Sequence, residues 1–172
     1  MPNFKLAAFK YSNTISFENT MVDDSLQQPD KYFQQTFGKL VSYSPDKKKY
    51  LDFYSGQLVF DTLSVNGKKT ITVSADVDQY LFLGDYARKK ISRILFMGTT
   101  KSFEEAVWIT DNDFMLAGTT RNDDEFLPFL YVGDVKKRQL RCYLPENKNI
   151  KRDTIYRSPR WKNIRGLNMK DL

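Results

Sequence analysis

The stretch from Tyr80 to Phe96 reads YLFLGDYARKKISRILF, and the stretch from Phe129 to Leu144 reads FLYVGDVKKRQLRCYL. Each contains an apolar run that ends in Gly-Asp, a short basic turn, and a run in which apolar and polar residues alternate. This pattern predicts two antiparallel strands joined by a tight turn. The two Gly-Asp pairs lie 49 residues apart, a period typical of propeller-type repeats. We therefore expect an all-β fold with an internal repeat.

A further pair of candidate strands precedes each of these stretches. Ser44-Pro45-Asp46 predicts a tight turn in the first half, and Asp111-Asn112-Asp113 predicts one in the second. These two turns lie 65 residues apart, whereas the Gly-Asp pairs lie only 49 residues apart. The first half is therefore longer than the second, and the additional residues lie between 57 and 78. Asn66-Gly67 in that segment is a strong hairpin signal. Each half is predicted to be a four-stranded antiparallel meander, with a hairpin inserted in the first.

The flanking segments predict fewer elements. Strands are expected over 4–11 and 14–18, with Ser12-Asn13 as a turn between them. A short helix is expected at about 30–37, with three aromatic residues near one face, namely Tyr32, Phe33 and Phe37. At 172 residues the chain is predicted to be a single domain. Its parts are an N-terminal segment, a first repeat, a second repeat and a basic tail, at 1–38, 39–98, 99–145 and 146–172.

Large apolar side chains in the candidate strands predict the core. The expected anchors are Tyr43, Phe53, Leu81, Leu83, Ile94, Phe96, Trp108, Leu116, Leu130, Val132, Leu140 and Tyr143.

Residues 39–144 resemble the blades of TolB-type (WD40-like) β-propellers. Ser44-Pro45-Asp46 with its lysines resembles the turn between the first two strands of such a blade, and the stretch 80–96 resembles its third and fourth strands. A second resemblance, through residues 102–112 (SFEEAVWITDN), is to small uncharacterised bacterial exported proteins. Neither resemblance implies an assigned activity.

The sequence departs from the blade pattern in ways that affect the expected architecture. Ile109-Thr110-Asp111 replaces Ser-Pro-Asp in the second copy, and the usual glycine after the aspartate is Lys47 in one copy and Asn112 in the other. Two blades also cannot close a propeller, which takes four to eight. We expect the two meanders to pack as a sandwich or half-propeller, or to assemble with other chains.

The composition excludes several kinds of catalytic site. The chain has no histidine and one cysteine, Cys142. Ser-His-Asp and Cys-His nucleophilic sites are therefore absent, as are zinc sites built from histidine or from several thiolates. Cys142 lies in an alternating strand pattern and is expected to be a buried apolar residue. The sequence predicts no cofactor.

Acidic residues are the remaining candidates for a metal site or a catalytic pair. Asp111, Asp113, Asp123 and Asp124 form an acidic group whose carboxylates are the kind of ligand that Ca²⁺ takes, but no EF-hand-like loop is present and aspartate favours turns by itself. Turns are the preferred interpretation. Glu104-Glu105 and Asp76/Asp78 each offer half of a glycosidase carboxylate pair, and a carboxylate-based glycan hydrolase is the least favoured function.

Positive charge is concentrated at the C-terminal end. Residues 1–147 contain 19 basic and 19 acidic residues, whereas residues 148–172 contain 8 basic and 2 acidic ones, so the tail carries the whole net charge of +6. Basic and aromatic side chains alternate there and can contact phosphates and stack on bases. The candidate binding residues are Arg152, Tyr156, Arg157, Arg160, Trp161, Lys162 and Arg165. Alternatively, the aromatic residues anchor the tail to the core.

Three predicted turns are basic, at 47–49, 88–90 and 136–138. Their charges either keep the protein soluble or form a basic rim that binds an anionic partner. Solubility is the preferred explanation, because nearby acidic residues cancel the net charge of the body.

The leading hypothesis is a non-enzymatic binding module that contacts protein or a polymeric ligand through loops at one end. A polyanion binder, for nucleic acid or an anionic glycan surface, is the alternative. No apolar run is long enough to span a bilayer, and residues 1–11 lack a secretory signal pattern. The compartment stays open between the cytoplasm and, if a leader has been removed, the periplasm or envelope.

Overall fold

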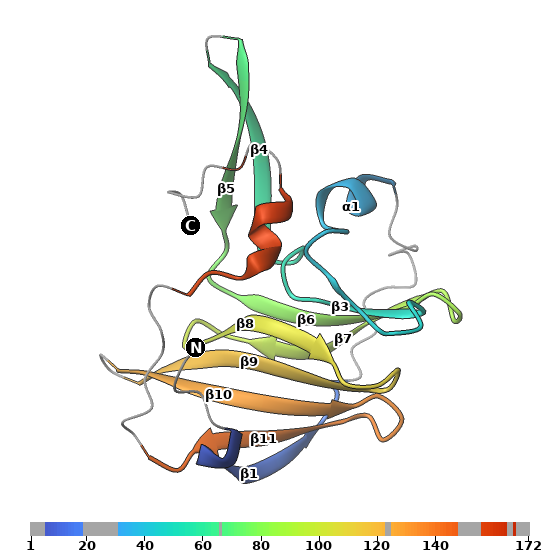
Figure 1. The fold of residues 1–172 in the computed structure, drawn as a ribbon, viewed down its shortest axis with the longest axis vertical. Helices are drawn as coiled ribbons and strands as arrows, with labels where there is room; N and C mark the ends of the chain where they lie inside the picture. The colour runs from blue at the N-terminus through green and yellow to red at the C-terminus, as the bar shows by residue number, and fades with distance from the viewer. Residues whose placement is uncertain are drawn as a thin grey trace.

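Two antiparallel sheets pack face to face as a β-sandwich, and a separate two-stranded hairpin projects from it (Figure 1). One sheet has the strand order β2-β3-β6-β7, and the other has the order β1-β11-β10-β9-β8. The all-β sandwich predicted from the sequence is confirmed. The computed structural model describes residues 6–18, 31–65, 67–122, 125–147, 156–164 and 167.

The four-stranded sheet contains β2 (Ser42–Tyr43), β3 (Lys49–Asp52), β6 (Gln79–Asp85) and β7 (Lys90–Met97). The five-stranded sheet contains β1 (Phe9–Ser16), β8 (Lys101–Trp108), β9 (Asp113–Asn122), β10 (Glu125–Asp134) and β11 (Gln139–Pro145). The projecting hairpin is β4 (Leu58–Val65) and β5 (Lys68–Ala75). Three short helices complete the described elements: η1 (Leu6–Ala8), α1 (Lys31–Thr36) and η2 (Pro159–Asn163).

The glycine of each Gly-Asp pair makes room for an aromatic ring on the neighbouring strand. Gly84 pairs with Tyr50, and Gly133 pairs with Phe114. A Cβ atom at Gly84 would lie 2.0 Å from the Tyr50 ring, and one at Gly133 would lie 2.1 Å from the Phe114 ring. Both rings are almost completely buried. The Gly-Asp motif therefore sets the packing of one large ring in each sheet.

The basic turns after these glycines also share a construction. The Asp85 carboxylate accepts a hydrogen bond from the Arg88 amide at 3.0 Å, and the Asp134 carboxylate accepts one from the Lys137 amide at 2.9 Å. Asp85 and Asp134 also form ion pairs with the Arg88 and Lys137 side chains. The aspartates therefore fix the start of each turn.

Three basic residues occupy the left-handed region of backbone space. Lys47, Lys89 and Arg138 have φ angles of 57°, 53° and 56°, and they are the only residues other than glycine with a positive φ in the described part of the chain. Each lies in one of the basic turns, at a position where glycine or asparagine is favoured. A side chain with a Cβ costs about 1 kcal/mol there relative to glycine.

The edges of the two sheets are bridged on both sides. The Ser42 hydroxyl donates to the Ala106 carbonyl at 3.1 Å, and the Trp108 indole donates to the Ser42 carbonyl at 2.8 Å, which joins β2 to β8. On the other side the Glu18 amide donates to the Ile94 carbonyl at 3.0 Å. These bonds occupy backbone groups that an open sheet would leave exposed.

The predicted core anchors are confirmed only in part. Phe53, Leu81, Ile94, Trp108, Leu116 and Leu140 belong to the buried core, and Leu83 packs against it. Leu130 is buried outside that core, and Tyr43, Val132 and Tyr143 are half-buried outside it, because Phe129 and Tyr131 are the β10 residues that face the core. Phe96 is 39% exposed. The register shifts in β7 so that Leu81 pairs with Leu95 and Phe82 with Arg93, and this bulge turns Phe96 outward onto the Tyr80 ring.

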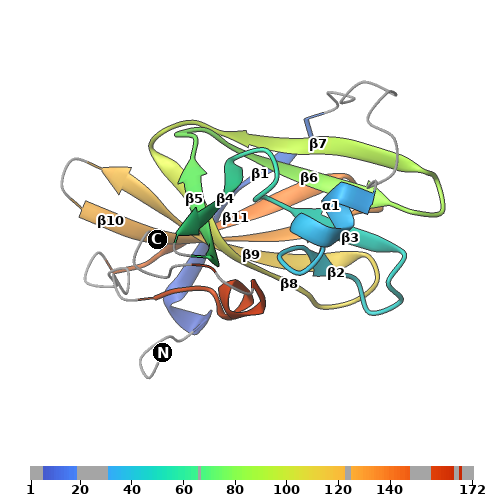
Figure 2. The same cartoon turned by 90° about the horizontal axis from the view of Figure 1, so that it is seen from above.

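The N-terminal segment differs from the prediction. No turn forms at Ser12-Asn13; instead β1 continues through it with a register shift between Tyr11 and Asn13 and pairs with β11 as an edge strand. The predicted helix is α1, where the Phe33 ring packs against Phe37 and Tyr50. Tyr32, predicted on the same face, is exposed. In Figure 2 α1 lies over β3.

The predicted inserted hairpin is present as β4–β5, paired from Leu58–Ala75 to Val65–Lys68. Gly67 in its turn has a φ of +74°, the conformation that the Asn-Gly signal predicts. Cys142 is buried, and burial raises the pKa of its thiol, so the expectation of a packed apolar residue is confirmed.

We predict that Gly84→Ala and Gly133→Ala each lower the free energy of unfolding by about 2–3 kcal/mol, because the added methyl group overlaps a buried ring. Urea denaturation measures this loss. Gly98→Ala is the matched control, since no atom lies within 4 Å of its Cβ position. Equal stability of all three variants would contradict the proposed packing role.

Candidate functional site

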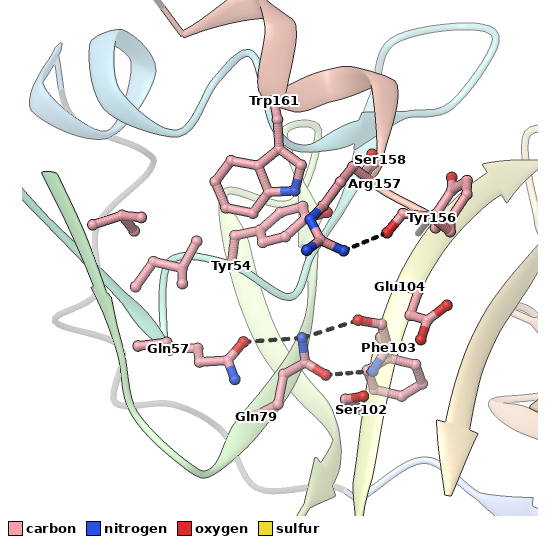
Figure 3. A pocket seen from close by; sticks show the side chains of 13 residues that line it. Tyr54, Gln57, Gln79, Ser102, Phe103, Glu104, Tyr156, Arg157, Ser158 and Trp161 are labelled. Carbon is pink, nitrogen blue, oxygen red and sulfur yellow. Dashed lines mark hydrogen bonds between the residues drawn. The ribbon is translucent and has the colours of Figure 1, made fainter. Parts of the chain in front are cut away.

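A cleft lies where three segments distant in sequence meet. It has a volume of about 350 Å³ and is bounded by the base of the β4–β5 hairpin, the start of β8 and the C-terminal segment 156–161 (Figure 3). We call it the tail cleft. Its lining residues are Tyr54, Gln57, Leu58, Val73, Ala75, Gln79, Ser102, Phe103, Glu104, Tyr156, Arg157, Ser158 and Trp161.

Gln79 forms the floor of the tail cleft and closes the edge of β8. Its side-chain oxygen accepts from the Phe103 amide at 2.5 Å, and its side-chain nitrogen donates to the carbonyl oxygens of Phe53 at 3.1 Å and Phe103 at 3.4 Å. The same nitrogen donates to the Gln57 side chain at 3.1 Å. A buried amide with this many bonds fixes the β3–β4 connection against β8.

Aromatic rings form one wall. The Trp161 ring contacts the Tyr54 ring edge to face with centroids 5.2 Å apart, and Figure 3 shows both rings above Gln79 with Glu104 and Tyr156 across the cleft. Trp161 is only 9% exposed. Burial raises the pKa of the Tyr54 hydroxyl well above its usual value, so this side chain stays neutral.

Glu105 fastens the tail to the sandwich. Its carboxylate forms an ion pair with Arg160 at 2.8 Å and accepts hydrogen bonds from the Tyr156 hydroxyl at 3.0 Å and the Ser158 hydroxyl at 2.8 Å. Arg160 also donates to the Ala106 carbonyl at 2.6 Å. Burial, followed by the nearby Glu105 charge, raises the pKa of Tyr156 to about 12. One carboxylate therefore positions three tail side chains.

Asp52 shapes the loop that carries Tyr54. It is buried at the end of β3 and accepts hydrogen bonds from the amides of Tyr54 at 2.9 Å and Ser55 at 3.0 Å, and from the Ser55 hydroxyl. Burial raises the pKa of this carboxyl in spite of those bonds. Asp52 thus holds the Tyr54 ring at the cleft, and its burial favours the protonated, neutral form of the carboxyl.

The predicted tail residues have different environments. Tyr156, Arg157 and Trp161 line the tail cleft, whereas Arg160 is engaged by Glu105 and Lys162 is exposed. Arg152 and Arg165 lie outside the described residues. The aromatic anchors named as an alternative role for the tail are therefore seen at Tyr156 and Trp161.

Sequence reasoning missed Tyr54, Gln57 and Gln79 as cleft residues. Tyr54 and Gln57 lie in the connection between β3 and β4, Gln79 is the first residue of β6, and no motif marks any of them. A glutamine opening an apolar strand, as Gln79 does, is the one signal that a buried polar contact was present.

The acidic candidates serve the turns. The Asp111 carboxylate accepts from the Asp46 amide at 2.9 Å, and the Asp113 carboxylate accepts from the Thr110 hydroxyl at 2.8 Å. Asp123 and Asp124 lie outside the described residues. Within the described ranges no group of three or more histidine, cysteine, aspartate or glutamate side chains is placed to hold a metal ion.

The carboxylates considered for glycan hydrolysis do not form a free pair around the tail cleft. Glu104 lines it, but both Glu105 oxygens are occupied by the tail. Asp111 lies at the other end of β8, and the Asp76 carboxylate accepts from the Val77 amide at 2.6 Å.

Comparison with known proteins finds no family model, no curated protein and no solved structure that matches the chain. Among the described residues, no helix has the length and apolar character needed to cross a membrane.

We predict that Glu105→Gln lowers the free energy of unfolding by about 1–2 kcal/mol, since Arg160 loses its partner in a partly buried position. The tail segment should also become a faster target for trypsin at Arg157, Arg160 and Lys162. Limited proteolysis and urea denaturation measure both effects. Glu146→Gln, which breaks an exposed ion pair with Lys10, should change neither; similar behaviour of the two variants would contradict the fastening role.

Asp52 gives a prediction with a defined sign. Its folded-state pKa is raised, so its contribution to stability is present below the unfolded pKa and is lost as the pH rises through the folded pKa. Asp52→Asn keeps the amide contacts without this titration, and its stability relative to wild type should rise between pH 4 and pH 7. Asp46→Asn should show little change over the same interval, because hydrogen bonds from Ser44 and Lys48 lower the pKa of Asp46 and its titration therefore falls below pH 4. Urea denaturation at both pH values tests the pair, and parallel trends would refute the assignment.

Proposed function

We propose that the protein is a binding module, without a chemical step of its own, that holds a short segment of a glycan polymer in the tail cleft. The observation that carries this proposal is the combination of aromatic rings with Gln57, Glu104 and Arg157 around one open cleft of about 350 Å³. This volume is at the lower end of the range for small-molecule sites, roughly 300–1,000 Å³. Rings can cover the apolar faces of a sugar while amide, carboxylate and guanidinium groups bind its hydroxyls.

A glycan is favoured over a protein partner because the β8 edge beside the cleft is already occupied. An extended peptide binds a sheet edge through backbone hydrogen bonds. Here Gln79 takes both the amide and the carbonyl of Phe103, and Ser42 and Arg160 take the carbonyl of Ala106. The edge therefore offers a peptide strand few backbone partners, whereas a sugar does not need them.

The alternative that the tail binds a polyanion has less support than glycan binding in the cleft. Of its described basic side chains Arg160 is neutralised by Glu105, and the Trp161 ring is packed against Tyr54 rather than presented for stacking. Arg157 and Lys162 are the two exposed cations of the segment.

We also infer that the two halves are copies of one blade-like unit related to TolB-type repeats. The pairing of Gly84 with Tyr50 and of Gly133 with Phe114 supports this, as do Lys89 and Arg138, which have the same backbone conformation 49 residues apart. Similar energetic costs of alanine at the two glycines would agree with a common origin, and very different costs would count against it.

We predict that at least one of cellohexaose, chitohexaose and xylohexaose binds the full chain with a saturable heat in isothermal titration calorimetry. Arg157→Ala should weaken that binding about tenfold, the loss of one hydrogen bond to a charged group. Lys162→Ala is the matched control, since it removes the same charge from the same segment outside the cleft lining and should have no effect.

Three results would overturn the proposal. They are no binding of any hexasaccharide, equal losses in the two variants, and release of shorter sugars that depends on Glu104 or Asp111, which would identify a hydrolase.

A further inference from the structure

Four hairpin turns of the sandwich meet at the end opposite the tail cleft, as both views show at the right (Figures 1 and 2). They comprise residues 44–48, 86–89, 109–112 and 135–138, and we call them the turn platform. The tail cleft lies at the first residues of β6 and β8, and the platform follows their last residues. The two surfaces are therefore separate.

Hydrogen bonds join neighbouring turns of the platform in sequence around its rim. The Tyr86 amide donates to the Lys48 carbonyl at 2.9 Å, and the Asp46 amide donates to the Asp111 carboxylate at 2.9 Å. The Val135 amide donates to the Asn112 carbonyl at 2.9 Å. These bonds fix the turns relative to one another before any ligand arrives, which lowers the ordering cost of binding.

A small cleft lies between the basic turns at 86–89 and 135–138, the two neighbouring turns that these hydrogen bonds do not join. It has a volume of about 120 Å³ and is lined by Asp85, Arg88, Lys90, Ser92 and Arg138 over an apolar floor. A cleft of this size accommodates a single charged group rather than a whole ligand.

Positive charge predominates on and beside the platform. The nine basic residues are Lys47, Lys48, Lys49, Arg88, Lys89, Lys90, Lys136, Lys137 and Arg138, against five acidic ones, Asp46, Asp85, Asp111, Asp113 and Asp134. The surface thus has an excess of four positive charges even though residues 1–147 are neutral in total. Basic residues that are far apart in the sequence are therefore neighbours on this surface.

The three left-handed residues are all basic residues of this platform. Lys47, Lys89 and Arg138 occupy positions where glycine is the less strained residue. Strain that persists in this way is typical of functional positions. A solubility role would not require cations at these three backbone positions, because other exposed positions could carry them without strain.

We propose that the turn platform binds an anionic polysaccharide, with one sulfate or carboxylate group in the cleft between Arg88 and Arg138. A polysaccharide is favoured over single-stranded nucleic acid because the platform presents no ring for base stacking. Its aromatic residue, Tyr86, packs against Tyr50 and accepts a hydrogen bond from Gln34 at 3.1 Å. The basic side chains of the platform can bind the charged groups of a polysaccharide without contacting its sugar rings.

The test uses a fluorescein-labelled heparin dodecasaccharide and the full chain, by fluorescence anisotropy from 50 to 300 mM NaCl. Wild type should bind with an affinity that falls steeply with salt. The triple variant Lys47→Gly, Lys89→Gly, Arg138→Gly should bind at least about tenfold more weakly at 150 mM. It should retain or exceed the wild-type melting temperature, because glycine relieves the backbone strain. Loss of binding would then not reflect unfolding.

A control variant, Lys39→Gln, Lys101→Gln, Lys162→Gln, removes the same charge from exposed positions away from the platform. It should bind the heparin probe within about twofold of wild type if the platform, rather than net charge, is the site. Equal losses in the two triple variants, or no loss in the glycine variant, would overturn the proposal. Tighter binding of a 20-base-pair DNA duplex than of heparin at the same salt would overturn the choice of polysaccharide.

Discussion

The fold depends on two aromatic rings, each packed over a glycine of the neighbouring strand. Tyr50 covers Gly84 in one sheet, and Phe114 covers Gly133 in the other, with no space for even one methyl group between them. A strand glycine normally weakens a sheet, and a ring on the partner strand compensates for the missing side chain. Here the same contact also fixes the register of the strands on which the basic turns are built, since each glycine directly precedes the aspartate that starts its turn.

The two ends of the sandwich are built from different kinds of connection and present different side chains. At one end, short turns capped by Asp85 and Asp134 hold long basic side chains close to the sheets. At the other end, the long connections, the inserted hairpin and the tail form an open cleft lined by rings and amides. The strands β6 and β8 link the two, because each begins at the cleft and runs to the turns.

Polar groups in partly or fully buried positions, rather than apolar contacts alone, place the parts of the cleft. Gln79 seals the β8 edge, Asp52 shapes the loop with Tyr54, and Glu105 holds the tail. Removing one partner from such a group leaves a desolvated polar atom, so each is a specific constraint on geometry. The consequence is a cleft whose walls are fixed relative to one another although they come from segments far apart in the chain.

The sequence by itself determined the strands, the inserted hairpin and the short helix, because alternation, the Asn66-Gly67 pair and the aromatic spacing are local signals. It could not show that Ser12 is a bulge within one strand, or that a bulge near Ile94 turns Phe96 outward, since both depend on pairing with a partner strand. It pointed to Tyr156, Arg157 and Trp161 but not to Gln79 or Tyr54, whose role exists only through contacts more than 20 residues apart. Only the tertiary structure decided that Arg160 is neutralised by Glu105 and that four turns gather on one surface. The physical reason is that charge and concavity are properties of neighbours in space, and the sheets bring together residues that the chain keeps apart.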